Sequence, residues 1–155
     1  MAILNSMKVD MDISVVVPLY NEEESIAELC NWIRNVMEQN GFTYEIILVD
    51  DGSTDNSWSI IEDLGSENPQ VKGVSFSRNY GKSAALNTGF NYSSGKVVIT
   101  MDADLQDSPD EIPALYELIA EKNYDLVSGW KTKRYDPIAK TVPSKFFNFV
   151  TSFIS

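Results

Sequence analysis

Short apolar runs alternate along the chain with segments whose apolar residues recur every three or four positions. Five runs have the length and composition of strands: residues 13–17, 44–49, 71–76, 97–101 and 125–128. The first run, Ile-Ser-Val-Val-Val, is nearly continuous, which is typical of a parallel strand covered on both faces. Alternation of such strands with helices predicts a right-handed, mostly parallel α/β sheet.

The segments between the strands have the spacing of amphipathic helices. Apolar stripes of this kind fall within residues 26–37, 58–64, 83–92 and 112–119. Asn40 and Gly41 are the expected end of the first helix, and Ser53 and Asp55 are candidate caps for the second. We expect a leader over residues 1–12, one domain over 13–136, and the start of a helical, juxtamembrane segment over 137–155.

Composition narrows the chemistry that the chain can perform. With 155 residues and 43 % apolar content, the chain can bury a core, and no run reaches the roughly 18 apolar residues of a membrane span. Its first residues do not follow the pattern of a secretory signal, and the single cysteine, Cys30, fits a reducing compartment. Without histidine, Ser-His and Cys-His catalysis and His-ligated metals are excluded, which leaves carboxylates, Lys, Arg, Tyr or a hard metal ion.

Charge is distributed unevenly along the sequence. The net charge is −11, but residues 131–155 hold five basic residues and one acidic residue. The acidic remainder argues against nonspecific binding of nucleic acid. The basic, aromatic tail could face phosphates or an anionic membrane surface, and a solvated charged face is the alternative.

Four polar clusters follow the first four expected strands. They occupy residues 18–22, 50–53, 77–82 and 102–106. In parallel α/β sheets, ligands bind beyond the carboxyl ends of the strands. We therefore expect these clusters to meet at one edge of the sheet and to form a site there.

Asp102 and Asp104 are the most distinctive pair in these clusters. Carboxylates at positions i and i+2 of an extended segment can project to one side and bind one divalent cation. Gln106 could add a neutral oxygen, and such hard ligands favour Mg²⁺ or Mn²⁺, which keep positions open for substrate phosphates. The alternative is a turn that caps the helix after Pro109.

The other clusters offer groups that can bind a nucleotide. Asp50 or Asp51 can accept from a base or a ribose hydroxyl, although an ordinary turn explains the same residues. Neither a G-x-G-x-x-G motif nor a complete P-loop is present, so phosphate would be bound by a metal and by cations. Arg78 and Lys82 can supply those cations, or can form surface ion pairs. Tyr20 can line a base pocket or serve in packing.

Together, the four clusters resemble the family 2 glycosyltransferases, which have the Rossmann-like GT-A nucleotide-sugar fold. The matching segments are V-V-V-P-L-Y-N-E-E (15–23), I-L-V-D-D-G-S-T-D (47–55), S-R-N-Y-G-K-S-A-A-L-N-T-G (77–89) and M-D-A-D-L-Q-D-S-P (101–109). S-R-N-x-G-K and D-A-D-L-Q-D resemble in particular the transferases that act on polyprenyl phosphates, of the dolichyl-phosphate mannose synthase type.

This resemblance implies a role for each cluster. The expected nucleotide-sugar ligands are Pro18, Tyr20, Glu22, Asp50, Asp51, Arg78, Lys82 and Asp102. The expected metal ligands are Asp102, Asp104 and Gln106, with Mg²⁺ or Mn²⁺ as cofactor. Asp104, Lys131 and Arg134 are the expected catalytic residues, the last two on the acceptor side, where a segment richer in arginine would be expected.

The resemblance implies an inverting transfer of a sugar from a nucleotide donor to polyprenyl phosphate. A UDP-sugar is favoured over a GDP-sugar, and the whole protein is expected in the cytoplasm at the inner face of the membrane. The sequence is also compatible with a homo-oligomer. Transfer to a saccharide hydroxyl is the rival reaction, and it would need a base such as Asp104 or Asp107. A nucleotide-binding module without turnover is the rival of another class.

Overall fold

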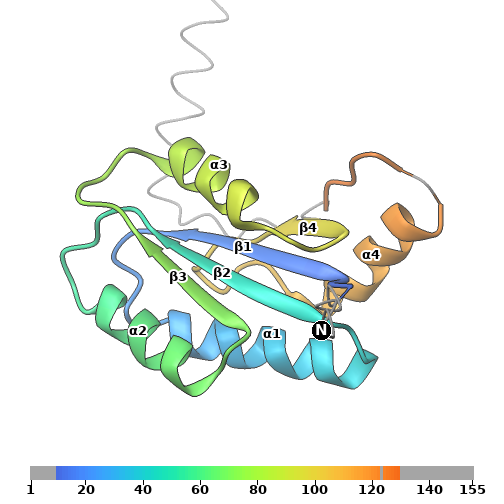
Figure 1. Ribbon diagram of the computed structural model, residues 1–155, viewed down its shortest axis with the longest axis horizontal. Helices are drawn as coiled ribbons and strands as arrows, with labels where there is room; N and C mark the ends of the chain where they lie inside the picture. Colours follow the sequence, from blue (N-terminus) through green and yellow to red (C-terminus); the bar gives the residue numbers. More distant parts are fainter. Residues whose placement is uncertain (1–9, 123, 130–155) are drawn as a thin grey trace, which may run out of the picture.

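The computed structural model describes residues 10–122 and 124–129, which form a parallel sheet with helices on both faces (Figure 1). The strands are β1 (Ile13–Leu19), β2 (Tyr44–Asp50), β3 (Val71–Ser75) and β4 (Val97–Thr100), in the order β3-β2-β1-β4. The helices are α1 (Ile26–Asn40), α2 (Ser57–Glu67), α3 (Lys82–Tyr92) and α4 (Ile112–Ala120), and a 3₁₀ turn (Pro109–Glu111) precedes α4. The expected α/β class is confirmed.

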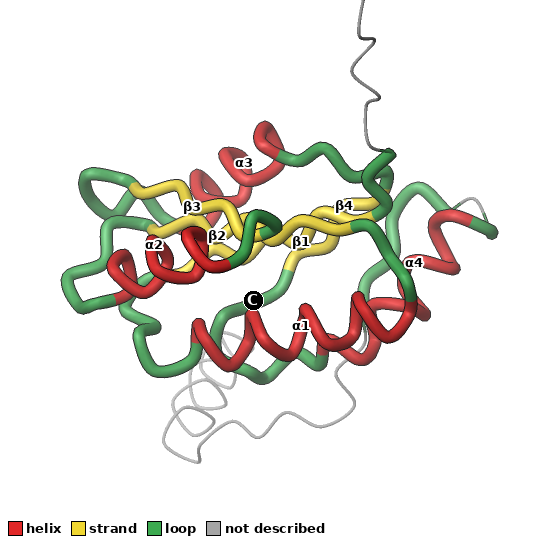
Figure 2. Tube along the Cα trace, turned by 60° about the horizontal axis from the view of Figure 1, so that its bottom comes forward, coloured by secondary structure: helices red, strands yellow, loops and turns green. Residues whose placement is uncertain are grey.

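The helices divide into two layers. Helices α1, α2 and α4 lie on one face of the sheet and α3 lies on the other (Figures 1 and 2). The larger core cluster lies on the first face and includes Leu29 and Ile33 of α1, packed with Val15 of β1. Val16 packs with Ala85 in the smaller cluster under α3. Burial of every residue of β1 explains its nearly continuous apolar sequence.

Gly41 ends α1 as expected, because its φ of +69° is in the left-handed region that glycine adopts without strain. The caps expected for α2 are wrong in detail. The helix begins at Ser57, and Asn56 at its cap position makes no side-chain capping hydrogen bond. Asp55 does accept from the backbone N–H of Ser57 at 3.0 Å, whereas the Ser53 hydroxyl oxygen accepts from the N–H of Asn21 instead.

The strand expected at residues 125–128 is also wrong. This segment does not pair with the sheet, and Leu126 is 86 % exposed. A short apolar run becomes a strand only when it can pair with a strand at the edge of a sheet, and among the described strands β4 pairs with β1 alone. No helix in the described part of the chain is long and apolar enough to cross a membrane.

A buried carboxylate joins the strands at the amino edge of the sheet. Glu45 is 1 % exposed, accepts from the Ser14 hydroxyl and the Ser94 N–H at 2.6 Å each, and forms an ion pair with Lys72. Burial opposes ionisation of Glu45, but these donors outweigh it and lower the pKa of the carboxyl below its ordinary value. One side chain thus links β1, β2, β3 and the turn before β4.

A second group of hydrogen bonds reinforces the same edge. Asp12, which the sequence pattern places in the leader, donates its N–H to Thr43 Oγ1 at 2.9 Å. In return its carboxylate accepts from the N–H and the hydroxyl of Thr43 at 3.1 and 2.7 Å.

Candidate nucleotide-sugar site

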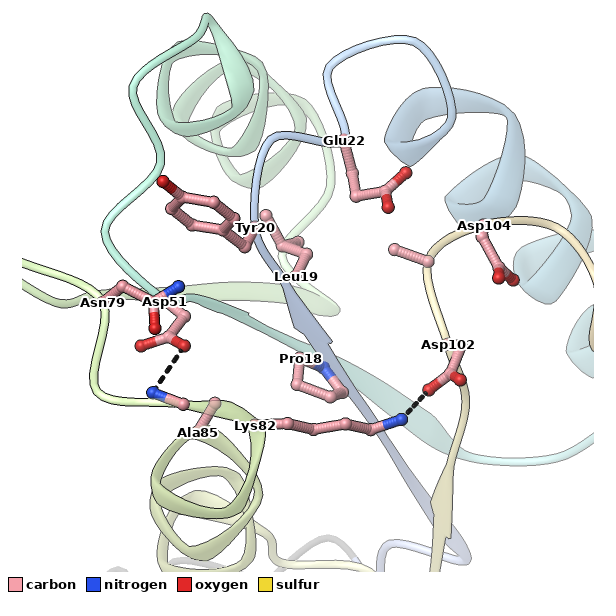
Figure 3. A pocket seen from close by; sticks show the side chains of 12 residues that line it. Pro18, Leu19, Tyr20, Glu22, Asp51, Asn79, Lys82, Ala85, Asp102 and Asp104 are labelled. Carbon is pink, nitrogen blue, oxygen red and sulfur yellow. Dashed lines mark hydrogen bonds and ion pairs between the residues drawn. The ribbon is translucent and has the colours of Figure 1, made fainter. Parts of the chain in front are cut away.

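A cleft of about 330 Å³ opens at the carboxyl ends of the strands, beside the first turn of α3 (Figure 3). Segments that follow all four strands contribute to it, as the polar clusters predict. Its lining residues are Pro18 and Leu19 at the end of β1, Tyr20 and Glu22 after it, Asp51 after β2, Asn79 and Gly81 between β3 and α3, Lys82 and Ala85 of α3, and Asp102, Ala103 and Asp104 after β4.

The two adjacent aspartates at the end of β2 have different surroundings. Asp50 is buried and does not line the cleft, and its carboxylate accepts from the Ser53 N–H and the Ser75 hydroxyl, each at 3.0 Å. Asp51 lines the cleft and accepts from the N–H groups of Tyr80 and Gly81 at 2.7 and 2.9 Å. Asp50 therefore joins β2 to β3, and Asp51 holds the start of α3 at the cleft.

Gly52 allows this close approach of the loops. A Cβ atom there would lie 2.4 Å from the backbone carbonyl carbon of Arg78, and its φ of +73° disfavours other residues. The Arg78 side chain is exposed and is not among the residues that line the cleft. Its guanidinium carbon lies 4.8 Å from the centre of the Tyr80 ring, at a cation–π distance.

Lys82 and Asp102 face each other across the cleft and form an ion pair (Figure 3). Asp104 follows on the same segment and also lines the cleft, while its carboxylate accepts from the Gln106 N–H at 3.0 Å. Gln106 itself is exposed and does not line the cleft, because the chain turns at Leu105, whose φ is +60°. Of the three expected metal ligands, Asp102 and Asp104 thus line the cleft and Gln106 does not.

The charges of the cleft bear on whether a metal ion fits there. Within the described residues, its lining holds the carboxylates of Glu22, Asp51, Asp102 and Asp104 and the ammonium of Lys82. No set of three or more acidic, cysteine or histidine side chains is arranged as a metal site in this part of the chain. Two carboxylates are nevertheless enough to hold Mg²⁺ or Mn²⁺ when phosphate oxygens fill the remaining coordination positions of the ion. A diphosphate would also need added positive charge in so acidic a cleft.

Several lining residues were not predicted individually as ligands. Asn79 belongs to the cluster at 77–82, and it reaches the cleft because Asp51 holds the neighbouring backbone. Ala85 lies three residues after Lys82, so the helical repeat places both on the same side of α3. The expected acceptor residues Lys131 and Arg134 lie outside the described residues, as does the segment 137–155.

The sequence of this chain is similar to those of one family of known proteins. Residues 14–154 match the family model described as glycosyl transferase family 2. An undecaprenyl-phosphate 4-deoxy-4-formamido-L-arabinose transferase from Pseudomonas fluorescens is 45 % identical over 137 residues. The match covers 88 % of this chain and 40 % of that protein, so the chain spans well under half of its relative's length.

Solved structures with a similar fold are also glycosyltransferases. Glucosyl-3-phosphoglycerate synthase from Mycobacterium tuberculosis, in complex with UDP, has a TM-score of 0.64 and 28 % identity over 80 % of this chain and 46 % of its own. A mannosyltransferase from Pyrobaculum calidifontis, in complex with GDP-Man and Mn²⁺, has a TM-score of 0.62 and 27 % identity over 74 % of this chain and 34 % of its own. The fold is therefore of the GT-A type. Because the family model matches nearly the whole length of this chain, the chain belongs to glycosyl transferase family 2.

Proposed function

We propose that this chain is the donor-binding part of an inverting glycosyltransferase that moves a sugar from a nucleoside diphosphate to polyprenyl phosphate. The observation that carries the proposal is the meeting of Asp102, Asp104 and Lys82 at one cleft, at the carboxyl ends of the strands. The similarity to an undecaprenyl-phosphate sugar transferase supports polyprenyl phosphate as the acceptor.

The nucleoside occupies the end of the cleft formed by Tyr20, Glu22 and Asp51. The half-exposed Tyr20 ring, 44 % accessible, offers a face on which a base can stack. The diphosphate lies nearer Lys82, which is the cation of the lining, whereas Arg78 belongs to the rim. We favour UDP over GDP because the glucosyl-3-phosphoglycerate synthase structure holds UDP, although the mannosyltransferase holds GDP-Man.

Asp102 and Asp104 would hold a divalent cation, Mg²⁺ or Mn²⁺, together with oxygens of the diphosphate. When bound, this ion neutralises charge on the leaving nucleoside diphosphate. Support comes from the two carboxylates, Asp102 and Asp104, that line the cleft and from the Mn²⁺ in the mannosyltransferase complex. Lys82 adds a positive charge on the opposite wall, where it can donate to a phosphate oxygen.

In the proposed reaction, an oxygen of the lipid phosphate attacks the anomeric carbon as the bond from that carbon to the diphosphate breaks. The electron pair of that bond leaves with the nucleoside diphosphate, and attack from the opposite face inverts the anomeric centre. A lipid phosphate is already ionised at neutral pH, so the reaction needs no strong general base. This requirement agrees with a sequence that contains no histidine.

The acceptor side of the proposal involves Lys131 and Arg134, which would bind the lipid phosphate as cations. A basic, aromatic segment near a membrane surface would bring the site to its lipid substrate. We therefore place the whole protein at the cytoplasmic face of the membrane.

The donor site can be tested by calorimetric titration of UDP and GDP, with and without Mn²⁺. We expect Mn²⁺-dependent binding of UDP that is lost in Asp104→Ala and unchanged in Asp63→Ala. Asp63 is a suitable control because it is an exposed aspartate of α2, away from the cleft. Absence of binding of either nucleotide to the folded protein would contradict the proposal.

The acceptor can be tested with undecaprenyl phosphate in detergent and UDP-linked 4-deoxy-4-formamido-L-arabinose as donor. The expected product is a lipid-linked sugar that partitions into organic solvent and releases its sugar in mild acid. A product on an added oligosaccharide would indicate transfer to a hydroxyl instead. Nucleotide binding without transfer to either acceptor would favour a module without turnover.

A further inference from the structure

Two loops that border the cleft are hydrogen-bonded to each other through their side chains. The first, here the β1 loop, comprises residues 20–25, and the second, the β2 loop, comprises residues 51–57. Both contain motifs that the family resemblance assigns as a whole to nucleotide binding. Their contacts divide these motifs into residues that face the cleft and residues that face the other loop.

Successive backbone N–H groups of the β1 loop donate to side chains of the β2 loop. Asn21 donates to Ser53 Oγ at 2.9 Å, Glu22 to Ser57 Oγ at 3.0 Å, and Glu23 to Asp55 Oδ2 at 3.2 Å. Backbone groups beyond the end of a strand lack ladder partners, so side-chain acceptors such as these replace the ladder.

Bonds also run in the reverse direction. The Thr54 N–H donates to Asn21 Oδ1 at 2.8 Å. The N–H and the side-chain amide of Asn56 both donate to Glu23 Oε2, at 2.8 and 2.7 Å. Each loop thus supplies both donors and acceptors to the other, and neither can shift without breaking several bonds.

The residues that make these side-chain contacts alternate with residues that line the cleft. Tyr20 and Glu22 line it, whereas the side chains of Asn21 and Glu23 accept from the β2 loop. Asn21 has a φ of +55°, a conformation that asparagine tolerates better than most residues. The turn at Asn21 therefore lies between Tyr20 and Glu22, which line the cleft, while the Asn21 side chain is hydrogen-bonded to the β2 loop.

We propose that Asn21 and Glu23 are positioning residues, which hold Tyr20 and Glu22 in the orientation that binds the nucleoside. The inference rests on the proposed function because it takes a nucleoside diphosphate as the ligand of this cleft. Side chains fixed before binding lose less conformational entropy when the ligand arrives. Loss of the contacts between the loops should therefore weaken nucleotide binding even where the protein stays folded.

Paired variants separate the hydrogen bonds from backbone strain. Asn21→Gly accepts the left-handed φ but removes the acceptor, whereas Asn21→Asp keeps an acceptor at the same place. Glu23→Ala removes the contact with Asn56, and Glu23→Gln keeps one oxygen that can accept from it. We expect the Gly and Ala variants to bind UDP about tenfold more weakly, and the Asp and Gln variants to bind within about twofold of the unmodified protein.

Asp12→Ala is a matched control. It removes the two hydrogen bonds that the Asp12 carboxylate accepts from Thr43, which join the segments before β1 and β2 at the edge of the sheet opposite the cleft. We expect it to lower the melting temperature without changing the UDP dissociation constant. All titrations are made at a temperature where circular dichroism shows each variant to be folded.

The outcomes distinguish this inference from the proposed function. If the unmodified protein binds neither UDP nor GDP, the proposed function fails before the variants are compared. If it binds UDP and folded Asn21→Gly and Glu23→Ala bind equally well, the donor site stands and the positioning role is overturned. The same follows if Asp12→Ala weakens binding as much as they do, because the effect then comes from stability alone.

Discussion

The Lys82 ammonium and the Asp102 carboxylate form an ion pair that spans the cleft from the first turn of α3 to the segment after β4. Both side chains are about half exposed, at 59 % and 43 %. The pair thus contributes little to stability, since exposed ion pairs contribute at most about 1 kcal/mol. Its position matters more, because Asp102 is also one of the two carboxylates proposed to hold the metal ion.

Lys82→Met should separate the two interactions of this lysine. Removal of the ammonium frees Asp102, so Mn²⁺ without nucleotide should bind about two- to fivefold more tightly. The complex of Mn²⁺ with UDP should bind about tenfold more weakly, because a phosphate loses its cation. Electron paramagnetic resonance of free Mn²⁺ and calorimetry measure the two effects.

Lys122→Met is the control, since Lys122 lies away from the cleft and its Nζ is 3.7 Å from Glu117 Oε1. Unchanged Mn²⁺ affinity in Lys82→Met would show that the ion pair does not compete with the metal.

Glu45→Gln should destabilise the protein in a pH-dependent way. At pH 7 the variant leaves the Lys72 ammonium without its carboxylate, and we expect a loss of about 3 kcal/mol in the free energy of unfolding. The folded-state pKa of Glu45 is lowered, so its ionised form stabilises the protein at pH values above the ordinary pKa of 4.5. That contribution is lost as the pH falls from 4.5 through the lowered pKa.

Urea unfolding at pH 7, 5, 4 and 3 tests this expectation. The difference between the unmodified protein and Glu45→Gln should be largest at pH 7 and 5 and should shrink at pH 4 and 3. A difference that stays constant over this range would mean that the charge of Glu45 contributes nothing.

Gly52→Ala and Gly41→Ala form a second matched pair. Both positions have positive φ, at +73° and +69°, but only at Gly52 would an added Cβ meet backbone atoms within 4 Å. Gly41→Ala should cost about 1 kcal/mol for its conformation alone. Gly52→Ala should cost about 3 kcal/mol or displace the loop at Arg78, and should also weaken UDP binding. Chemical denaturation and calorimetry measure both effects, and equal losses in the two variants would contradict the close approach of the loops.

Cys30 should be unreactive in the folded protein. It is a residue of α1, 4 % exposed in the core, and burial raises the pKa of its thiol to about 12. Because the thiolate is the reactive form, we expect an aromatic disulfide reagent at pH 8 to label the native protein only as it opens. Labelling should be rapid and complete in guanidinium chloride. Rapid labelling without denaturant would show that α1 is not held against the sheet.

The sequence predicts the central strands and the position of the cleft because both depend on local patterns. β1 and β2 are buried at every residue, which is why their sequences are mostly apolar. The carboxyl ends of parallel strands share one edge, so the four polar clusters had to lie near one another. The short run at 125–128, Asp-Leu-Val-Ser, pairs with none of the described strands, because pairing depends on contacts distant in sequence.

The roles of neighbouring polar residues could not be predicted in the same way. Asp50 and Asp51 are identical and adjacent, yet one joins two strands and the other lines the cleft. Which direction a side chain takes at the end of a strand depends on the alternation of the strand and on the loop packed beside it. The contacts of Asn21 and Glu23 with the β2 loop likewise involve residues more than thirty positions away.

The buried carboxylate of Glu45 and the cleft lie at opposite edges of the same sheet. A strand of seven residues, such as β2, is roughly 23 Å long, so the two regions share few neighbours. Effects of substitutions at such distances are usually additive. Substitutions in the loops at the cleft should therefore change ligand binding without weakening the hydrogen bonds around Glu45, and substitutions around Glu45 should change stability without changing the cleft.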